Sequence, residues 1–190
     1  MNRLHHWLCR SAFWRRHVSD ELVPWVLEGL SPGRDVLEIG PGPGAATPVL
    51  QARADRLICL ELDEGLAGGL ALQWAGRVGV VRGDATCLPF RDASMDAVVA
   101  LTMLHHVPSV DLQDRLLHEA VRVLRPGGLL AGSDSLASIA LRAIHVFDTF
   151  LPVDPRTFTA RLAAAGLASV SVDHRRHTFR FRGRRPACDG

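Results

Sequence analysis

The sequence predicts an α/β protein built on one doubly wound sheet that is mostly parallel and carries an antiparallel hairpin at its C-terminal end. Three observations favour this fold class. Short apolar runs alternate with segments that are helical or long enough for a crossover, which indicates parallel pairing. A glycine-rich turn follows the first run, where such sheets bind ligands. Two late runs are only a few residues apart, which requires antiparallel pairing.

The expected parallel strands are short runs rich in valine, leucine and isoleucine. They lie at residues 35–39, 57–61, 78–82, 96–101 and 129–133. No run in the chain approaches the roughly 18 consecutive apolar residues of a membrane-spanning helix. We therefore expect no membrane span.

The first expected helices flank the first strand. Ser19 has the side chain of an N-cap residue, and Asp20 and Glu21 would occupy the first turn of a helix that runs to about Leu30. A second helical pattern covers residues 45–54, directly after the glycine-rich turn.

Two later helices have clear boundaries. Apolar residues line one face of the segment 111–124, and Pro126-Gly-Gly128 ends it. The segment 155–165 is another helix, closed by Gly166.

The expected hairpin consists of residues 168–173 and 177–182. Phe179 and Phe181 alternate with arginines, so one face of the last strand should be buried and the other solvated.

The composition indicates one domain. With 190 residues and 47% hydrophobic residues, the chain can bury one substantial core but is too short for two ordinary domains. All 22 basic residues are arginine, and 20 acidic residues leave a net charge of +2, which argues against a nucleic-acid partner. The excess positive charge is unevenly distributed, because six arginines lie close to the C-terminus. Such a run of charges is usually found on a solvated face. These are residues 175, 176, 180, 182, 184 and 185.

The cysteines and the N-terminal residues indicate the cellular compartment. They lie at 9, 59, 87 and 188, without metal-ligand spacing, and are expected to be reduced and structural. The N-terminal residues include arginines and histidines but no continuous apolar leader. Both features favour a cytoplasmic protein.

The stretch Val36-Leu-Glu-Ile-Gly-Pro-Gly-Pro-Gly44 is the most informative motif. It places a glycine at every second position, with Glu38 two residues before the first of them. Glycine has no Cβ, so a ligand can lie against this backbone, and the amides of the next helix point toward it. With Ala45, the first two glycines also match the dinucleotide pattern GxGxxA. Glu61 follows at the distance expected of an acid that accepts both ribose hydroxyls, in either a nicotinamide or an adenosyl ligand.

Downstream residues separate these two ligands. Three further stretches matter. The third strand leads into Gly83-Asp-Ala-Thr-Cys-Leu-Pro-Phe90, the fourth strand begins with Asp96-Ala-Val-Val99, and the helix before the fifth strand closes with Arg122-Val-Leu-Arg-Pro-Gly-Gly128. Together with the glycine stretch, they resemble the small class I S-adenosylmethionine-dependent methyltransferases of the UbiE-like, type 11 group. The resemblance covers residues 35 to about 134, and the late hairpin is similar to that family's reversed last strand.

The resemblance implies a Rossmann-like methyltransferase domain over residues 1–190. Within it we expect an N-terminal helical lid at 1–30, a cofactor-binding core at 31–134, and C-terminal helices and a hairpin at 135–190. The first segment carries several aromatic and imidazole side chains that could form a lid over the pocket, or could pack the first helices against the sheet. These are His5, His6, Trp7, Trp14 and His17.

The resemblance also implies that S-adenosylmethionine is the cofactor and S-adenosylhomocysteine its product. Gly40, Gly42 and Gly44 would approach the methionine part, and Glu38 would orient its amino group. Glu61 would hold the ribose hydroxyls, at a position where the family more often has Asp.

The adenine end of the cofactor would lie over the turn after the third strand. By the same resemblance, Asp84 would accept from the adenine amino group and the Ala85 amide would meet a ring nitrogen. Leu62 and Leu88 would flank the ring, and the backbone at Leu101 would close the methionine end.

His105, His106 and Asp134 are the candidate catalytic residues, because they follow the fourth and fifth strands, whose ends face the methyl group in similar enzymes. A histidine with a carboxylate in reach could accept a proton from an acceptor hydroxyl. Alternatively, one histidine packs and the other caps the loop. His145 and Asp148 either border the acceptor pocket or are ordinary helix residues.

We expect the acceptor to be a small, largely apolar metabolite, bound by a monomer or homodimer. No metal is expected, because the sequence offers no spaced acidic set for chelation. The segment Leu101-Thr-Met103 lacks the [Asn/Asp]-Pro-Pro-aromatic motif of exocyclic amino methyltransferases. Three other functions stay open: an RNA methyltransferase, suggested by the terminal arginines; an NAD-dependent oxidoreductase; and a cofactor-binding accessory subunit without catalysis, since 190 residues leave little room for an acceptor site.

Overall fold

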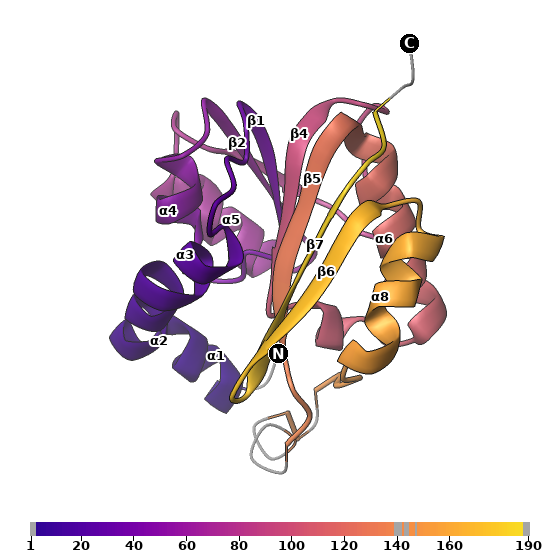
Figure 1. Cartoon of the computed structure of the whole chain (residues 1–190). Helices are drawn as coiled ribbons and strands as arrows, with labels where there is room; N and C mark the ends of the chain where they lie inside the picture. Colours follow the sequence, from indigo (N-terminus) through magenta and orange to yellow (C-terminus); the bar gives the residue numbers. More distant parts are fainter. Residues whose placement is uncertain (1–2, 139–141, 143–144, 147, 188–190) are drawn as a thin grey trace.

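The computed structural model describes residues 3–138, 142, 145–146 and 148–187 of the chain. These residues form one seven-stranded sheet in the order β3-β2-β1-β4-β5-β7-β6 (Figure 1). The strands are β1 Asp35–Ile39, β2 Arg56–Glu61, β3 Gly79–Arg82, β4 Met95–Leu101, β5 Leu124–Ser135, β6 Ala168–Arg175 and β7 Thr178–Arg184.

The pairing confirms the predicted fold class. Strands β1 to β5 pair with one another in parallel, whereas β7 is antiparallel to both β5 and β6. The chain order reverses between β1 and β4, which lie side by side in the middle of the sheet. In open α/β sheets this reversal opens a crevice beyond the carboxyl ends of the strands, where ligands bind.

Helices cover both faces of the sheet (Figure 1). Helices α3, α4 and α5 lie on one face, and α6 and α8 lie on the other. The helical elements are α1 Arg3–Arg10, α2 Ala12–His17, the π-helical turn Val18–Leu22, α3 Val23–Val26, α4 Thr47–Gln51, α5 Glu64–Gln73, the 3₁₀ turn Leu104–His106, α6 Val110–Val123 and α8 Pro155–Ala164.

Alternation along the central strands produces these two layers. Leu37 and Val98 pack into the apolar core beneath α6 and α8, while Val36 and Val99 pack into the core beneath α3. Successive side chains of a strand point to opposite faces, so both faces need apolar residues when helices cover both. This is why the predicted strands appear in the sequence as continuous apolar runs.

Three details of the expected elements are wrong. Ser19 is not an N-cap, because it lies inside the π-helical turn and its hydroxyl donates to the carbonyl of Arg16, 3.2 Å away. The helix after the glycines is only Thr47–Gln51, shorter than the expected 45–54. Helix α6 matches the expected segment, but Pro126-Gly-Gly128 does not end it, because these residues lie in β5, which begins directly after the helix and shifts register opposite Met95 and Ala97.

An ion-pair network joins the amino ends of β1, β4 and β5. The Arg125 guanidinium donates to Asp96 at 2.5 Å and to Asp35 at 2.8 Å, and the second Asp96 oxygen accepts from the backbone amides of Arg34 and Asp35. The Arg125 contact is the first cause that lowers the pKa of Asp35. The network therefore holds three strand starts in register at the end of the sheet opposite the expected ligand site.

The C-terminal hairpin is buried on one face, as its alternation predicted. Phe179 and Phe181 of β7 lie beneath α8, and their rings meet the Phe158 ring edge-on at centroid distances of 5.9 and 5.0 Å. On the opposite face, Arg180 and Arg182 reach the last turn of α3 and donate to its backbone carbonyls.

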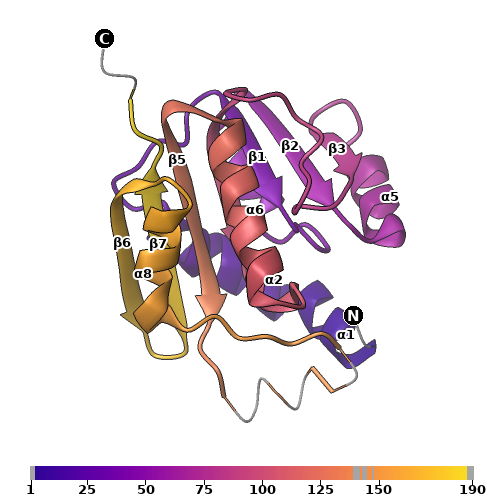
Figure 2. The ribbon, with the colours of Figure 1, turned by 90° about the vertical axis from the view of Figure 1, so that its right-hand side faces the viewer.

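The two ends of the sheet have different surroundings (Figure 2). Helix α1 and the segment that leads into α8 lie at the end where the parallel strands finish, whereas the C-terminus leaves from the other end. Among the described residues, no helix is long and apolar enough to cross a membrane. The side chains of His5 and His6 and the whole of Cys188 lie outside the described part of the chain.

Replacing Phe158 by alanine should lower the free energy of unfolding by about 3–5 kcal/mol, because the substitution removes a fully buried ring and leaves a cavity against β7. Urea denaturation followed by circular dichroism measures the change. Phe13→Ala is the matched control, since that ring is 77% exposed and should cost less than about 1 kcal/mol. Equal losses in the two variants would contradict the packing of α8 on the hairpin.

Candidate active site

The glycine loop between β1 and α4 has an open cradle at its centre. Gly40, Gly42 and Gly44 have positive φ angles of 64°, 56° and 82°, in the left-handed region that disfavours other residues. A Cβ built on Gly40 or Gly44 would press against the side chain of Met103 or Leu70, at 3.0 and 2.8 Å. A Cβ on Gly42 would meet nothing within 4 Å. The space above Gly42 is therefore available to a ligand that lies against the backbone.

Glu61 fixes the position of this loop. One of its carboxylate oxygens accepts from the Gly42 amide at 3.0 Å, and the other accepts from the Asp63 amide at 3.1 Å. The Asp63 side chain has a different role, because it caps α5 by accepting from the Leu66 amide. The acid predicted to hold the ribose thus lies at the edge of the glycine loop, and its neighbour two residues later is a helix cap.

Glu38 is buried beneath the same loop. Its carboxylate accepts from the Thr47 hydroxyl at 2.8 Å and from the Cys59 thiol at 3.3 Å. Burial raises the pKa of Glu38 to about 7, the two hydrogen bonds oppose that shift, and the charge of Glu61 adds to it. A carboxyl group in this state can change its charge near neutral pH, and a cation placed beside it would favour the ionised form.

The turn predicted to contact adenine is held in place by its own Asp84. One oxygen of the exposed Asp84 carboxylate accepts from the amide and the hydroxyl of Thr86, both at 2.8 Å. Ala85 packs at the edge of the core, and the Leu88 side chain is buried. Asp84 therefore stands at the surface of a turn whose far end is anchored in the core.

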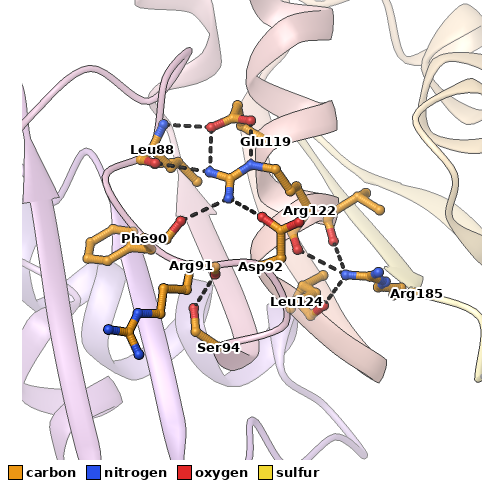
Figure 3. Close-up of polar contacts among 10 residues, drawn as sticks. Leu88, Phe90, Arg91, Asp92, Ser94, Glu119, Arg122, Leu124 and Arg185 are labelled. Carbon is orange, nitrogen blue, oxygen red and sulfur yellow. Dashed lines mark hydrogen bonds and ion pairs between the residues drawn. The ribbon is translucent and has the colours of Figure 1, made fainter.

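Arg122 supplies that anchor from α6 (Figure 3). Its guanidinium donates to the carbonyls of Leu88 and Phe90 at 3.0 and 2.8 Å and pairs with Glu119, which itself accepts from the Leu88 amide. A further bond at 2.6 Å joins Arg122 to Asp92. The contact with Arg122 is the main cause that lowers the pKa of Glu119. The Arg122 motif found in the sequence thus fastens the turn that carries Asp84.

The two remaining cofactor candidates have opposite exposures. Leu62 directly follows β2 and is 66% exposed, as expected of a side chain that a ligand covers. Leu101 ends β4 and is buried, and the next residue, Thr102, has a positive φ of 52°. This backbone turn directs the chain after β4 toward the glycine loop, where Met103 contacts Gly40.

The 3₁₀ turn Leu104–His106, called the histidine turn below, follows β4 and meets the end of β5, as the sequence predicted. His105 Nδ1 lies 2.5 Å from Asp134 Oδ1, and the His105 backbone amide donates to the other carboxylate oxygen at 3.0 Å. Both side chains are almost completely buried, and His105 Nε2 is buried without a hydrogen-bond partner. Because the carboxylate accepts, Nδ1 carries the proton and Nε2 presents a lone pair.

His145 joins this pair, although no sequence pattern assigned it a decisive role. It is buried and lies in a turn, and its ring is 5.0 Å from the His105 ring and 5.2 Å from the His106 ring, between centroids. Phe150 stacks on it at 4.6 Å. The interpretation of His145 as an ordinary helix residue is therefore wrong. Nothing in the sequence signals the contact, because α6 and β5 separate His145 from His106 along the chain and the sequence that follows β5 shows no periodic pattern.

Gln113 is a second residue that sequence reasoning missed. From α6, its buried side-chain amide donates to the carbonyls of Leu104 and Leu151, both at 3.1 Å. The Leu151 amide also donates to the His105 carbonyl at 2.8 Å. These bonds tie the segment after β5 to the histidine turn. Gln113 breaks the apolar pattern of the buried face of α6, which was an available signal.

Cys59 and Thr47 are the other supporting residues that were missed. Cys59 is the direct partner of Glu38 in the pairing of β1 with β2, so its side chain points to the same face of the sheet. Strand alignment alone could have identified it. Thr47 opens α4, and its hydroxyl is in reach because the glycine loop turns back over β1.

The family follows from a comparison with known proteins. Residues 37–132, just over half of the chain, match the family described as "Methyltransferase domain". This chain belongs to that family. The resemblance to class I S-adenosylmethionine-dependent methyltransferases is thereby confirmed.

Several curated relatives resemble this methyltransferase domain. A probable S-adenosylmethionine-dependent methyltransferase of Mycolicibacterium smegmatis is 36% identical over 123 residues, 64% of this chain and 45% of the relative. A demethylmenaquinone methyltransferase of Mycolicibacterium paratuberculosis is 36% identical over 65% of this chain and 48% of the relative. A malonyl-[acyl-carrier protein] O-methyltransferase of Methylococcus capsulatus is 30% identical over 86% of this chain and 62% of the relative. The chain thus spans about half of the length of the first two relatives.

Solved structures share the fold. A methyltransferase in complex with the Trm112 methyltransferase activator of Haloferax volcanii aligns with a TM-score of 0.74 and 16% identity, over 98% of this chain and 99% of that one. The DhpI complex with S-adenosylhomocysteine aligns with a TM-score of 0.72 and 24% identity, over 98% and 96%. At these identities the likeness supports the architecture only.

Gly42→Val should remove cofactor binding and leave the domain folded, because the new side chain fills the open space above the loop. Gly127→Val is the matched control: its φ of 78° imposes a similar backbone cost, a Cβ there also meets nothing within 4 Å, and it lies at the start of β5. Calorimetry with S-adenosylhomocysteine and circular dichroism on the same samples separate binding from folding. Unchanged affinity in Gly42→Val would mean that the glycine serves only the turn.

Glu38 should make stability without ligand depend on pH. Its pKa is about 7 in the folded state and near 4.5 in the unfolded chain, so the unfolded state loses its proton first as pH rises. The contribution of Glu38 to the free energy of unfolding is therefore fully present below pH 4.5 and falls by up to about 3 kcal/mol as pH rises through 7.

Denaturation midpoints measured between pH 4.5 and 8 check this expectation. Glu38→Gln should flatten the decline, since glutamine does not ionise. Glu64→Gln, which changes an exposed ion pair with Arg82, should keep the wild-type profile. A decline of the same size in Glu38→Gln would assign the effect to another group.

Proposed function

We propose that this domain binds S-adenosylmethionine and transfers its methyl group to a small, largely apolar acceptor. The observation that carries the proposal is the open cradle at Gly42, which is held by one buried carboxylate and lies above another. Glu61 orients the loop from the end of β2, and Glu38 lies beneath it at the end of β1. A cationic amino acid joined to a ribose fits such a pair of acids.

Each cofactor residue has a role that fits its observed position. The sulfonium of the cofactor supplies an already activated methyl group, so the protein chiefly has to align the acceptor and exclude water. Glu38 would hold the amino group, and Glu61 the ribose hydroxyls. Asp84 and the Ala85 amide would bind the adenine edge, with Leu62 covering the ring and the Arg122 anchor holding the turn.

His105 would remove the acceptor's proton where the acceptor needs it. Asp134 holds the imidazole in the tautomer with a proton on Nδ1, so the lone pair of Nε2 is directed away from the carboxylate. The carboxylate would then stabilise the imidazolium after proton transfer. His106, less buried than His105, would contact the acceptor from the same turn.

The acceptor pocket would lie between the histidine turn and the segment that enters α8. Phe150 forms an aromatic wall 5.6 Å from the His105 ring, between centroids. A wall of this kind supports a small acceptor with an apolar body and one nucleophilic atom. The names of two relatives, a malonyl-[acyl-carrier protein] O-methyltransferase and a demethylmenaquinone methyltransferase, agree with such acceptors. A cytoplasmic location and a lid formed by residues 1–30 stay predictions.

The alternative of an RNA methyltransferase loses its main support. Four of the six terminal arginines donate to backbone carbonyls within the fold. Arg180 and Arg182 donate to carbonyls of α3, Arg184 donates to Gly127, and Arg185 donates to three carbonyls around the end of α6. Side chains used in this way have fewer donors left for phosphates. A steep decline of RNA affinity with salt would revive that alternative.

A binding comparison tests the proposal and its non-methyltransferase rivals. Calorimetry should detect S-adenosylmethionine and S-adenosylhomocysteine but not NAD. Binding of NAD alone would support the oxidoreductase, and cofactor binding without turnover of any acceptor would support the accessory subunit.

A pair of variants tests the ribose site itself. Glu61→Ala should weaken cofactor binding by roughly 2–3 kcal/mol, since two charge-assisted hydrogen bonds are lost. Asp63→Ala should keep the affinity and lower stability by about 1 kcal/mol, because it removes the cap of α5. The reverse result would place the ribose contact at Asp63.

A further inference from the structure

Three histidines gather at the ends of β4 and β5. Among the described residues, His105, His106 and His145 form the group of side chains whose ring nitrogen atoms could hold a metal ion, with one atom of each within 4.8 Å of the others. His105 and His145 are buried, and His106 is partly exposed. The group lies on the methyl-facing side of the proposed cofactor site, because His105 and His106 follow β4 directly.

Two of the three rings are oriented by acceptors at Nδ1. Asp134 accepts from His105, and the backbone carbonyl of Thr149 lies 3.3 Å from Nδ1 of His106. A carbonyl or carboxylate cannot donate, so Nδ1 carries the proton in both rings and Nε2 carries the lone pair. Metal-binding histidines are typically held this way, with the other ring nitrogen donating to a carboxylate or a carbonyl.

The lone pair on His105 Nε2 lacks a hydrogen-bond donor. The atom is buried and has no hydrogen-bond partner, although buried polar atoms normally have one. A protein donor at this place would have satisfied it. A cation between the rings would satisfy it as well, and the Asp134 carboxylate behind His105 would offset part of the added positive charge.

We propose that His105, His106 and His145 bind one divalent transition-metal ion, best matched by zinc, with its fourth position open toward the acceptor. Three neutral imidazoles and one open position are one of the ligand sets found in catalytic zinc sites. Nitrogen atoms that share a tetrahedral zinc lie about 3.3 Å apart, given bonds of roughly 2.0–2.1 Å. The rings must therefore close by up to roughly 1.5 Å, which rotation of the His106 and His145 side chains can supply.

The ion would activate the acceptor, and this part of the inference rests on the proposed function. A hydroxyl or thiol of the acceptor at the fourth position would release its proton to water, because a divalent ion stabilises the anion. The freed electron pair would form the bond to the methyl carbon, and the pair of the broken carbon–sulfur bond would remain on the cofactor's sulfur. His105 would then act as a ligand instead of a base.

Cobalt titration of untagged, chelator-treated protein tests metal binding without any acceptor. We expect one Co²⁺ per chain, with the visible absorption of a four-coordinate ion, and displacement by Zn²⁺. His145→Phe should weaken binding at least about 100-fold, because even the loss of an orienting partner costs 10–100-fold. Phenylalanine can keep the stack on Phe150, so the fold should survive. His106→Phe provides a second test on a less buried ligand.

His118→Phe is the matched control, since that histidine is exposed on α6 and should leave metal affinity unchanged. No saturable Co²⁺ binding by the wild-type protein would overturn the inference. Equal binding by wild type, His145→Phe and His106→Phe would do the same. Calorimetry with S-adenosylhomocysteine on these samples keeps the two proposals apart: intact cofactor binding without metal binding rejects only the metal site, whereas loss of cofactor binding in the wild type rejects the proposed function.

Discussion

The burial of carboxylates at the carboxyl ends of parallel strands is the constraint on which the candidate site depends. Glu38, Glu61 and Asp134 lie in β1, β2 and β5, close to their ends, and each is at most 8% exposed. A carboxylate taken out of water without partners costs several kcal/mol, so each of these groups needs donors. The end of a parallel strand offers few donors of its own, and the chain has to bring them back from the following loop.

Each solution shapes one part of the site. The amides of Gly42 and Asp63 turn toward Glu61, which places the glycine loop and the start of α5 around one carboxylate. The amides of His105 and Ser135 turn toward Asp134 and set the histidine turn in the same way. Glu38 has side-chain donors from Thr47 and Cys59, and its raised pKa reflects how incompletely two neutral donors replace water. The loops that would face a ligand are therefore ordered before it binds, which reduces the entropy lost on binding.

Local patterns were enough to predict the sheet, its crossovers, the glycine loop and the meeting of one histidine of the pair His105 and His106 with Asp134. Each of these depends on short-range alternation or on the rule that parallel strands end at one edge. Ser19 was misplaced because a serine hydroxyl can also bond to a carbonyl one turn earlier inside a helix, and the sequence does not distinguish the two uses. His145 could not be predicted, since it approaches the histidine turn from a stretch without a periodic sequence pattern, close to the point where Gln113 and His105 bind Leu151. Sequence reasoning succeeds here where geometry is periodic and fails where a side chain from a distant helix decides the path.

The histidine turn shows how one interaction can serve two kinds of chemistry. Asp134 fixes the tautomer of His105, and the resulting lone pair on Nε2 suits a proton and a metal ion equally well. A general base needs only this one ring and a proton to accept. A metal site needs further nitrogen atoms within reach and a negative charge close by, and His106, His145 and Asp134 meet those conditions. The added histidines, more than the geometry of His105 itself, therefore favour a ligand role for His105. They depend on Gln113 of α6, which binds Leu151 beside the histidine turn.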